Sequence, residues 1–378
     1  MISMPNWKKT KAEETELYNL IYIGTKGVDY GLCEIIKGKA NIIDFESSFF
    51  KDFVVSDIPS SKIEEIRDSI DKLLTKSKER TGKQTKQTLL GIPALYTLNQ
   101  TTTLRIKRDN PSEKVSKKEL EEINIRILAN SKLEAEKKLN TNQDSDLEIV
   151  NSDFSFIKLD GYLTKDIEGM RGSILEISQF SSFSSKQYLN NLVALAQSLR
   201  LSLVTVTSST YSLVKYIKEK TKLENYMLIN FGGHTTDVGI VFGGELINTS
   251  SIRIGTESLV SYISEKTEKD RERVIEALLK NEPDPSEVEV LQKTFEDFWL
   301  ESLLKSLDSI EGIKIYPNLI MIYGDEQLSI DKNRILAQLE KLKFKETPEI
   351  HSLKEKIDLV GEYPVILKSL ANFMQNLK

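Results

Sequence analysis

The chain has 378 residues, a length that suggests two or three folding units. Hydrophobic residues make up 39% and charged residues 29%, a balance typical of globular proteins. Lys and Arg number 52 against 57 Asp and Glu, a net charge of −5, which argues against a nucleic-acid partner because no strong positive field is present. A single cysteine excludes an internal disulfide, and with two histidines it offers no ligand set for structural zinc. We therefore expect a cytoplasmic protein.

The N-terminal segment, residues 1–17, contains no apolar run long enough for a signal peptide, and we expect it to be flexible. Its Met4 and Trp7, followed by lysines, could touch an anionic membrane surface, but fraying is the simpler prediction. No later stretch is long enough to span a bilayer. Membrane contact is therefore expected to be weak or indirect.

The opening third alternates strands with one helix. A helix is predicted over 61–80, because apolar residues recur at helical spacing behind a serine cap. The predicted strands are 18–24, 28–36, 40–47 and 86–93. This alternation predicts a mixed α/β sheet.

Residues 94–180 interrupt that alternation, and we interpret them as a small inserted α+β domain. The predicted elements here are a strand over 99–107, a helix over 116–139, and strands over 154–163 and 172–180. The main pattern resumes with a helix over 185–199, a strand over 201–207 and a helix over 209–219. The first subdomain is thus predicted to comprise 18–93 and 181–222.

The second subdomain, predicted over 223–363, repeats the opening order of strand, Gly/Thr turn, strand, Gly turn and strand, which indicates an internal duplication. Its predicted elements are strands over 226–231, 238–242, 245–254 and 317–323 and helices over 256–280, 288–307 and 330–342. Residues 364–378 carry a helical apolar stripe. We interpret them as a helix that returns to the first subdomain rather than a membrane anchor.

Glycine next to threonine at a strand-to-strand turn allows backbone N–H groups to approach a phosphate, while the hydroxyl donates one further bond. Gly24-Thr25 and Gly232 to Thr236 are two such turns. Facing each other across a cleft, they could clamp a nucleoside triphosphate. Either turn taken alone is better explained as an ordinary hairpin, and it is the duplication that favours the clamp.

These residues resemble a known family. LIYIGTKGVDYGLCEI resembles the first phosphate loop, and INFGGHTTDVGIVFGGELI the second, of FtsA, the actin-like bacterial cell-division family. VSKKELEEINIRIL and LDGYLTKDIEGMRGSILEIS are similar to its small inserted domain, and LIMIYGDEQL to its adenosine loop. The resemblance runs from about Leu20 to Phe373. It implies an α/β, actin-like ATPase (ribonuclease H-like) duplicated fold with an inserted small α+β domain, an architecture shared by the pilus-assembly scaffold PilM.

The resemblance also implies ATP as a ligand of the loops. Carried onto this sequence, the cofactor-binding residues are Gly24, Thr25, Lys26, Gly232, Gly233, His234, Thr235, Gly255, Thr256 and Gly324.

Departures from the family pattern weaken that expectation. Members that hydrolyse ATP hold Mg²⁺ with an acid at the start of each phosphate loop, where this chain has Tyr22 and Asn230. Asp29 would repel phosphate, and the Cβ of His234 would crowd it. Gly324 alone remains of the adenosine-loop glycines. We therefore expect weak ATP binding, no Mg²⁺ and no catalytic residue.

Two other motifs are set aside. TGKQT at 81–85 is similar to part of a Walker loop, but Ser77 stands in place of the first glycine. His234 and Asp237 invite an acid–base interpretation, yet polar residues of hairpins usually hydrogen-bond the turn itself.

Three functions compete. The first is an FtsA-like scaffold, peripheral at the inner face of the cell membrane, that links the tubulin-like division protein FtsZ to the membrane and self-associates into filaments. The second is a PilM-like adaptor of a pilus or secretion machine, which binds a short peptide from a membrane protein. The third is an active ATPase or kinase, which needs Asp29, Asp237 or Asp325 to replace the missing acids. Fold alone does not rank them.

Overall fold

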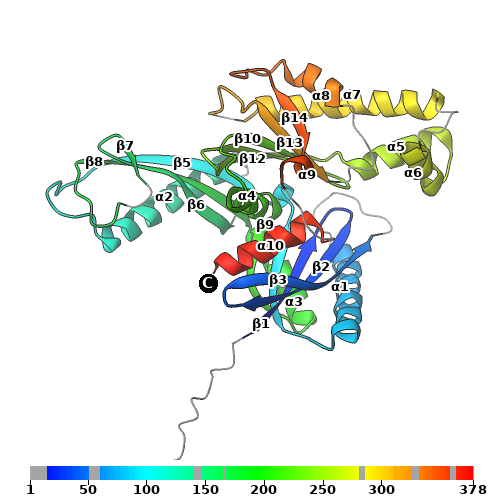
Figure 1. Cartoon of the computed structure of the whole chain (residues 1–378), viewed down its shortest axis with the longest axis horizontal. Helices are drawn as coiled ribbons and strands as arrows, with labels where there is room; N and C mark the ends of the chain where they lie inside the picture. Colours follow the sequence, from blue (N-terminus) through cyan, green and yellow to red (C-terminus); the bar gives the residue numbers. More distant parts are fainter. Residues whose placement is uncertain are drawn as a thin grey trace, which may run out of the picture.

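The computed structural model describes residues 15–50, 60–138, 146–164, 167–280, 286–310, 312–324, 332–357 and 363–377. These residues form three β-sheets with helices between and around them (Figure 1). None of the helices in these ranges is long and apolar enough to cross a membrane. Most of the predicted flexible segment lies outside the described residues, but its last two residues are already part of strand β1, which begins at Glu16.

The first sheet has the strand order β3-β2-β1-β4-β9. Its outer face is covered by α1 (Ser60–Thr81) and α3 (Lys186–Ser198), whose apolar stripes pack around Ile66, Ile70 and Leu192. Its inner face is covered by α10 (Val365–Asn376), through Leu367 and Leu370. The strands are β1 (Glu16–Ile23), β2 (Gly27–Ile36), β3 (Lys39–Phe49), β4 (Gln87–Ile92) and β9 (Ser202–Ser208).

The second sheet has the matching order β12-β11-β10-β13-β14. Its strands are β10 (Tyr226–Phe231), β11 (Thr236–Phe242), β12 (Glu245–Ile252), β13 (Leu319–Gly324) and β14 (Glu349–Ser352). Its outer face packs around Trp299 of α7. The outer helices are α5 (Thr256–Thr267), α6 (Arg271–Lys280), α7 (Ser286–Asp308) and α8 (Lys332–Leu339).

Helix α4 (Ser209–Lys220) lies between the two sheets and packs against α10, which gives the order sheet, helix, helix, sheet (Figure 1). The sequence placed α4 with the first subdomain. In the structure its apolar residues, such as Leu213 and Ile217, pack with Leu228 and Met321 of the second sheet. The helix thus follows the first sheet in chain order, at Ser208, and packs both on α10 and on the second sheet.

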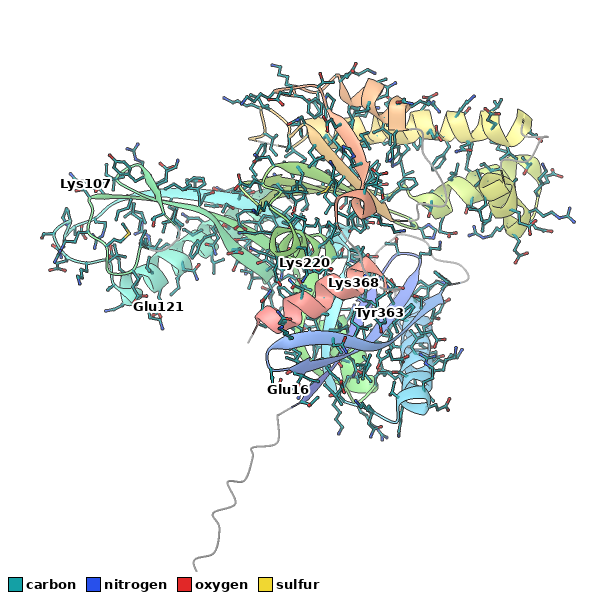
Figure 2. The ribbon with its side chains drawn as sticks, viewed as in Figure 1. Glu16, Lys107, Glu121, Lys220, Tyr363 and Lys368 are labelled. Carbon is teal, nitrogen blue, oxygen red and sulfur yellow. The ribbon has the colours of Figure 1, made fainter. Side chains whose placement is uncertain are left out.

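The third sheet has the order β5-β8-β6-β7 and forms an arm, at the left of Figure 1, with Lys107 and Glu121 near its outer end (Figure 2). Helix α2 (Lys117–Lys138) packs on it through Ile123 and Ile127. The strands are β5 (Leu98–Lys107), β6 (Leu147–Leu159), β7 (Tyr162–Thr164) and β8 (Ile174–Ser185). The predicted domain end at residue 180 therefore falls inside β8.

Several predicted elements differ from the structure. The helix predicted over 256–280 is two helices, α5 and α6, because Glu268 adopts a left-handed conformation (φ 55°) after α5. Strand β6 starts at 147 rather than 154 and ends at a turn where Asp160 and Gly161 both have positive φ. The sequence did not indicate β14 or α9 (Leu353–Lys356), which are short and polar.

Candidate functional site

A cleft of about 760 Å³ lies between the first and second sheets. Of the sequence-derived cofactor residues, Gly24, Thr25, Lys26, Gly232, Gly233, Thr235 and Gly324 line it. His234, Gly255 and Thr256 are not among its lining residues. The two Gly/Thr turns do meet at one cleft, as the duplication suggested.

The two turns have the same hydrogen bond at equivalent positions. The N–H of Gly24 donates to the carbonyl of Gly27, and the N–H of Gly232 donates to the carbonyl of Thr235, both at 2.9 Å. Each turn thus closes on itself three residues later. The internal duplication inferred from the sequence therefore extends to individual backbone contacts.

The two turns also touch each other. The hydroxyl oxygen of Thr25 accepts a hydrogen bond from the N–H of His234 at 3.1 Å. Gly233 packs so closely on Lys26 that a Cβ added to the glycine would lie 2.5 Å from the lysine Cβ. A backbone N–H suited to contact a phosphate is therefore already bonded within the protein.

The N-terminus of α5 is engaged in the same way. The N–H groups of Thr256 and Glu257 donate to the carbonyls of Gly232 (2.9 Å) and Gly233 (2.7 Å). A Cβ at Gly255 would clash with those carbonyls, which is why glycine stands there. Free N–H groups at a helix N-terminus bind anions, and these two are occupied by the second loop. Gly255 and Thr256 thus support the loop from outside the cleft.

The carboxylate of Glu257 joins the two halves of the molecule. It forms an ion pair with Lys26 of the first loop, at 3.5 Å, and another with Arg271 of α6. The side chain of Lys26 also lies over the ring of Phe49, 5.3 Å from its centroid. Lys26 is therefore held by protein groups on both sides.

The floor of the cleft repeats a three-strand pattern. In the first sheet Tyr22 lies opposite Asp29, which lies opposite Ser47; in the second, Asn230 lies opposite Asp237, which lies opposite Ser251. Each serine hydroxyl donates to its aspartate, at 2.5 Å and 2.6 Å. Sequence reasoning missed both serines, because they follow their aspartates at different spacings, on the third strand of each hairpin.

These interactions and burial set the ionisation of the floor. Burial raises the pKa of Asp237 to about 6, although the Ser251 hydroxyl and the nearby N–H groups of Ala94 and Leu95 favour the charged form. Burial likewise raises the pKa of Asp29, against the effects of Ser47 and Lys26. Burial also lowers the pKa of His234. Each carboxyl is thus hydrogen-bonded by a serine of the neighbouring strand, and burial favours its neutral form.

The aromatic ring of Tyr22 lies under the first loop. A Cβ added to Gly24 would come within 2.9 Å of that ring. Burial raises the pKa of this tyrosine, so it stays neutral. Within the described ranges, no group of three or more His, Cys, Asp or Glu side chains is arranged to hold a metal ion.

A second wall of the cleft was not indicated by the sequence. It comes from distant segments of the chain: Tyr323 of β13, Leu353 and Lys354 of α9, and residues 363–366 at the start of α10. Tyr363 lies near the first-sheet strands (Figure 2) and its ring meets that of Phe45 edge-on, with centroids 5.3 Å apart. These segments meet only in the folded chain, so no local pattern could have linked them.

No family model and no curated protein matches this sequence. Among solved structures, it is similar to PilM in the "PilM-PilN type IV pilus biogenesis complex", with a TM-score of 0.61, 11% identity and coverage of 96% of this chain and 98% of that one. The chain has the actin-like ATPase fold. The ethanolamine utilization protein EutJ from Carboxydothermus hydrogenoformans gives a TM-score of 0.49 at 9% identity, over 95% of this chain and 89% of that one. At such identities the likeness establishes the actin-like fold, and the FtsA-specific resemblance stays a prediction.

Two features of the cleft differ from a site for a magnesium-bound triphosphate. A magnesium-bound triphosphate needs free backbone N–H groups and acidic ligands near the cation. Here the N–H of His234 is bonded to Thr25, and Tyr22 and Asn230 stand at the start of the two loops.

Proposed function

We propose that this chain is a non-catalytic adaptor of the actin-like fold, which binds a short segment of a membrane-associated partner in a pilus- or secretion-type assembly. The observation that carries this proposal is the direct hydrogen bond between the two phosphate loops, from the N–H of His234 to Thr25. Because this hydrogen bond occupies a backbone N–H that could contact a phosphate, it favours a structural role for the two loops over nucleotide binding. PilM, which has the same fold, is found in a complex with PilN in type IV pilus biogenesis.

The arm supplies a candidate contact surface for such a partner. Among the described residues, β7 lies at the edge of this sheet and pairs with β6 alone. Tyr162 and Leu163 on this strand are 80% and 71% exposed. An edge strand with exposed apolar side chains can add an extended peptide through main-chain hydrogen bonds. Membrane association would then come through the partner, which places the protein peripherally at the inner face of the membrane.

A second candidate is an FtsA-like scaffold that binds FtsZ and self-associates into filaments. The segment DGYLTKDIEGM favours it, because this resembles the inserted domain of FtsA. Both candidates predict a protein-binding role without catalysis. They differ in the partner.

An active ATPase or kinase is the least favoured. Asp29 and Asp237 are each hydrogen-bonded by a serine, and Asp325 lies outside the described residues. We propose that ATP binds weakly and is not hydrolysed, and that Mg²⁺ plays no part.

The test is a calorimetric titration of the full chain with two sets of synthetic peptides. One set covers cytoplasmic segments of membrane proteins encoded by neighbouring genes, and the other is the C-terminal peptide of the cognate FtsZ. We expect a membrane-protein peptide to bind, and a Tyr162→Ser/Leu163→Ser variant to lose that binding. Ile149→Ser, which alters a 44% exposed side chain at the other end of the same sheet, is the matched control. Binding of the FtsZ peptide alone would replace the first candidate with the second.

A further inference from the structure

The sheet of the arm has one face covered by α2 and an opposite face that is partly open. Leu104 and Ile106 of β5 pack into the apolar cluster beneath α2. Since side chains alternate along a strand, Arg105 and Lys107 lie on the opposite face, where both are exposed. The strand register places four further side chains on that side of the sheet, and we call the six together the outer face: Arg105, Lys107, Phe156, Lys158, Leu163 and Glu176.

The outer face lies on the part of the arm that projects from the body of the molecule (Figure 1). Closer to the body, the same side of the sheet is covered: the ring of Phe180 stacks on that of Tyr211 in α4, and the hydroxyl of Thr101 donates to the carbonyl of Ile247 in β12. Lys107, by contrast, lies at the outer end of the arm (Figure 2). The outer face is therefore presented to the surroundings of the molecule.

Cations predominate on the outer face. Arg105, Glu176, Lys158 and Leu163 lie side by side across the four strands of the sheet. Glu176 forms an ion pair with Lys158, at 2.9 Å. Within the described ranges, the side chains of Arg105 and Lys107 have no hydrogen-bond or ion-pair partner. With three cations against one carboxylate, the outer face is positively charged, although the whole chain carries −5.

The segments next to the outer face do not reverse this charge. The carboxylate of Asp160, at the turn between β6 and β7, accepts hydrogen bonds from the N–H groups of Ser173 (2.9 Å) and Ile174 (2.7 Å), which partly offset its charge. The bordering segments 109–117 and 167–171 carry acids and bases in equal number: Asp109 and Glu113 against Lys114 and Lys117, and Glu168 against Arg171. The excess positive charge of the outer face is thus retained.

Apolar side chains accompany these cations. Leu163 is 71% exposed and lies next to Lys158 in the register. The ammonium group of Lys158 lies over the ring of Phe156, 4.5 Å from its centroid. Lysine and arginine combine apolar stems with charged heads, so they reach anionic groups from beside an apolar contact. Cations around an exposed leucine suit a surface that is anionic outside and apolar beneath.

Charge complementarity favours a lipid surface over a protein partner for this face. A protein would need carboxylates fixed at positions that match Arg105 and Lys107, whereas a layer of anionic headgroups supplies negative charge at any position. The end of a projecting arm also reaches a flat surface without a complementary pocket. Both arguments point to the anionic surface of a membrane.

We propose that the outer face of the arm contacts an anionic lipid surface directly. Arg105 and Lys107 bind headgroup phosphates, and Leu163 enters the boundary between headgroups and acyl chains. A peptide added at the edge of β7 uses main-chain groups, so the two contacts are compatible. This contact goes beyond the proposed adaptor function and does not depend on it.

The test is co-sedimentation of the full chain with vesicles of phosphatidylglycerol and phosphatidylcholine in equal amounts, and with vesicles of phosphatidylcholine alone. We expect binding to the anionic vesicles that weakens as salt is added, and little binding to the neutral ones. Arg105→Gln/Lys107→Gln should weaken binding about twentyfold, because each cation near an anionic surface contributes about fivefold. Lys72→Gln/Lys78→Gln, which removes two exposed lysines of α1 and changes the net charge equally, is the matched control and should bind like the wild type.

A third variant separates the apolar contact from the charges. Leu163→Ser should weaken binding to the anionic vesicles about threefold, by the same factor in low and high salt, because apolar burial is not screened. The melting temperatures of all three variants should match that of the wild type, since the substituted side chains are exposed.

Several outcomes would overturn the proposal. Equal binding by the wild type and Arg105→Gln/Lys107→Gln would place the lipid contact elsewhere, for example on residues 1–17. Absence of binding to phosphatidylglycerol vesicles would overturn it as well. Binding of soluble poly-L-glutamate that the same variant loses, without vesicle binding, would assign the outer face to an acidic protein partner. A failed peptide titration would refute the adaptor function and leave these results intact.

Discussion

The two hairpins that border the cleft have the same backbone geometry and differ in their side chains. Both turns close with the same hydrogen bond, and in both the third strand donates a serine hydroxyl to an aspartate of the second strand. A register shift occurs at equivalent places, after Leu32 in one and after Ile240 in the other. The side chains at equivalent positions differ, however: Tyr22 of the first hairpin corresponds to Asn230 of the second, and Lys26 corresponds to His234.

The backbone geometry of a hairpin and the ligand chemistry of the cleft therefore depend on different residues. The geometry depends on turn glycines and on serine–aspartate pairs buried below the surface. Ligand chemistry depends on the few side chains that reach the cleft. A duplicated hairpin therefore identifies the actin-like fold here more securely than it identifies an activity.

The largest difference between the hairpins is expected at Gly27 and its counterpart, Thr235. A side chain at Gly27 would clash with the backbone carbonyl of Ser48. Gly27→Thr should lower the free energy of unfolding by about 3 to 5 kcal/mol, and Thr235→Gly by only about 1 to 2 kcal/mol. Urea denaturation measures both. Equal losses would show that the two turns are packed alike.

The next largest effect is a pH dependence from Asp237. The pKa of this carboxyl is about 6 in the folded chain against an ordinary value of 3.8, so the folded state binds the proton more tightly. The free energy of unfolding should therefore fall as pH rises from about 4 to about 6, by up to about 3 kcal/mol. Asp237→Asn should remove this part of the slope in urea titrations at several pH values. Asp29→Asn should remove a further part, with the same sign. If the free energy of unfolding of Asp237→Asn falls with pH as steeply as that of the wild type, the account is contradicted.

The contact between the loops predicts a smaller effect. Thr25→Val keeps the shape of the side chain but leaves the N–H of His234 without its acceptor, at a cost of about 1 to 2 kcal/mol. Thr25→Ser retains the hydroxyl and should lose less. Hydrogen exchange at the His234 amide should accelerate in the valine variant only. Identical exchange in both variants would mean that Thr25 does not hold the loops together.

The smallest effect is expected at the ion pair between the halves. Lys26→Gln removes the pair with Glu257, but the lysine side chain is 35% exposed, so the loss should be below about 1 kcal/mol. Added salt should weaken the wild type towards the variant. Thermal melts in low and high salt measure this. A large, salt-independent loss would show that Lys26 acts through packing on Gly233 instead.

Much of the fold could be predicted because its signals are local. The strands around Gly24 and Gly232 are apolar runs bounded by turn residues, and the long helices carry clear apolar periodicity. Strand β14 escaped prediction because its four residues, Glu349–Ser352, pair with β13 alone within the described part of the chain, so tertiary contact rather than propensity makes it a strand. The break at Glu268 is a single residue in a left-handed conformation, which sequence periodicity does not indicate.

The candidate site could be predicted only in part, for the same reason. The two loops and Gly324 carry glycine patterns that the sequence displays. Tyr323, Lys354 and the start of α10 reach the cleft from segments that carry no shared motif, and their roles depend on the packing of three separate elements. That Tyr22 and Asn230, rather than acidic residues, stand at the start of the two loops was visible in the sequence. The direct hydrogen bond between the loops, from the N–H of His234 to Thr25, was not.

The central claim is that the cleft retains the actin-like fold without its metal-dependent nucleotide chemistry. Its most direct test is the release of phosphate from ATP by the purified full chain, with and without Mg²⁺. The account predicts no release above the protein-free rate in either condition. Mg²⁺-dependent turnover that is lost in an Asn230→Ala variant would contradict it.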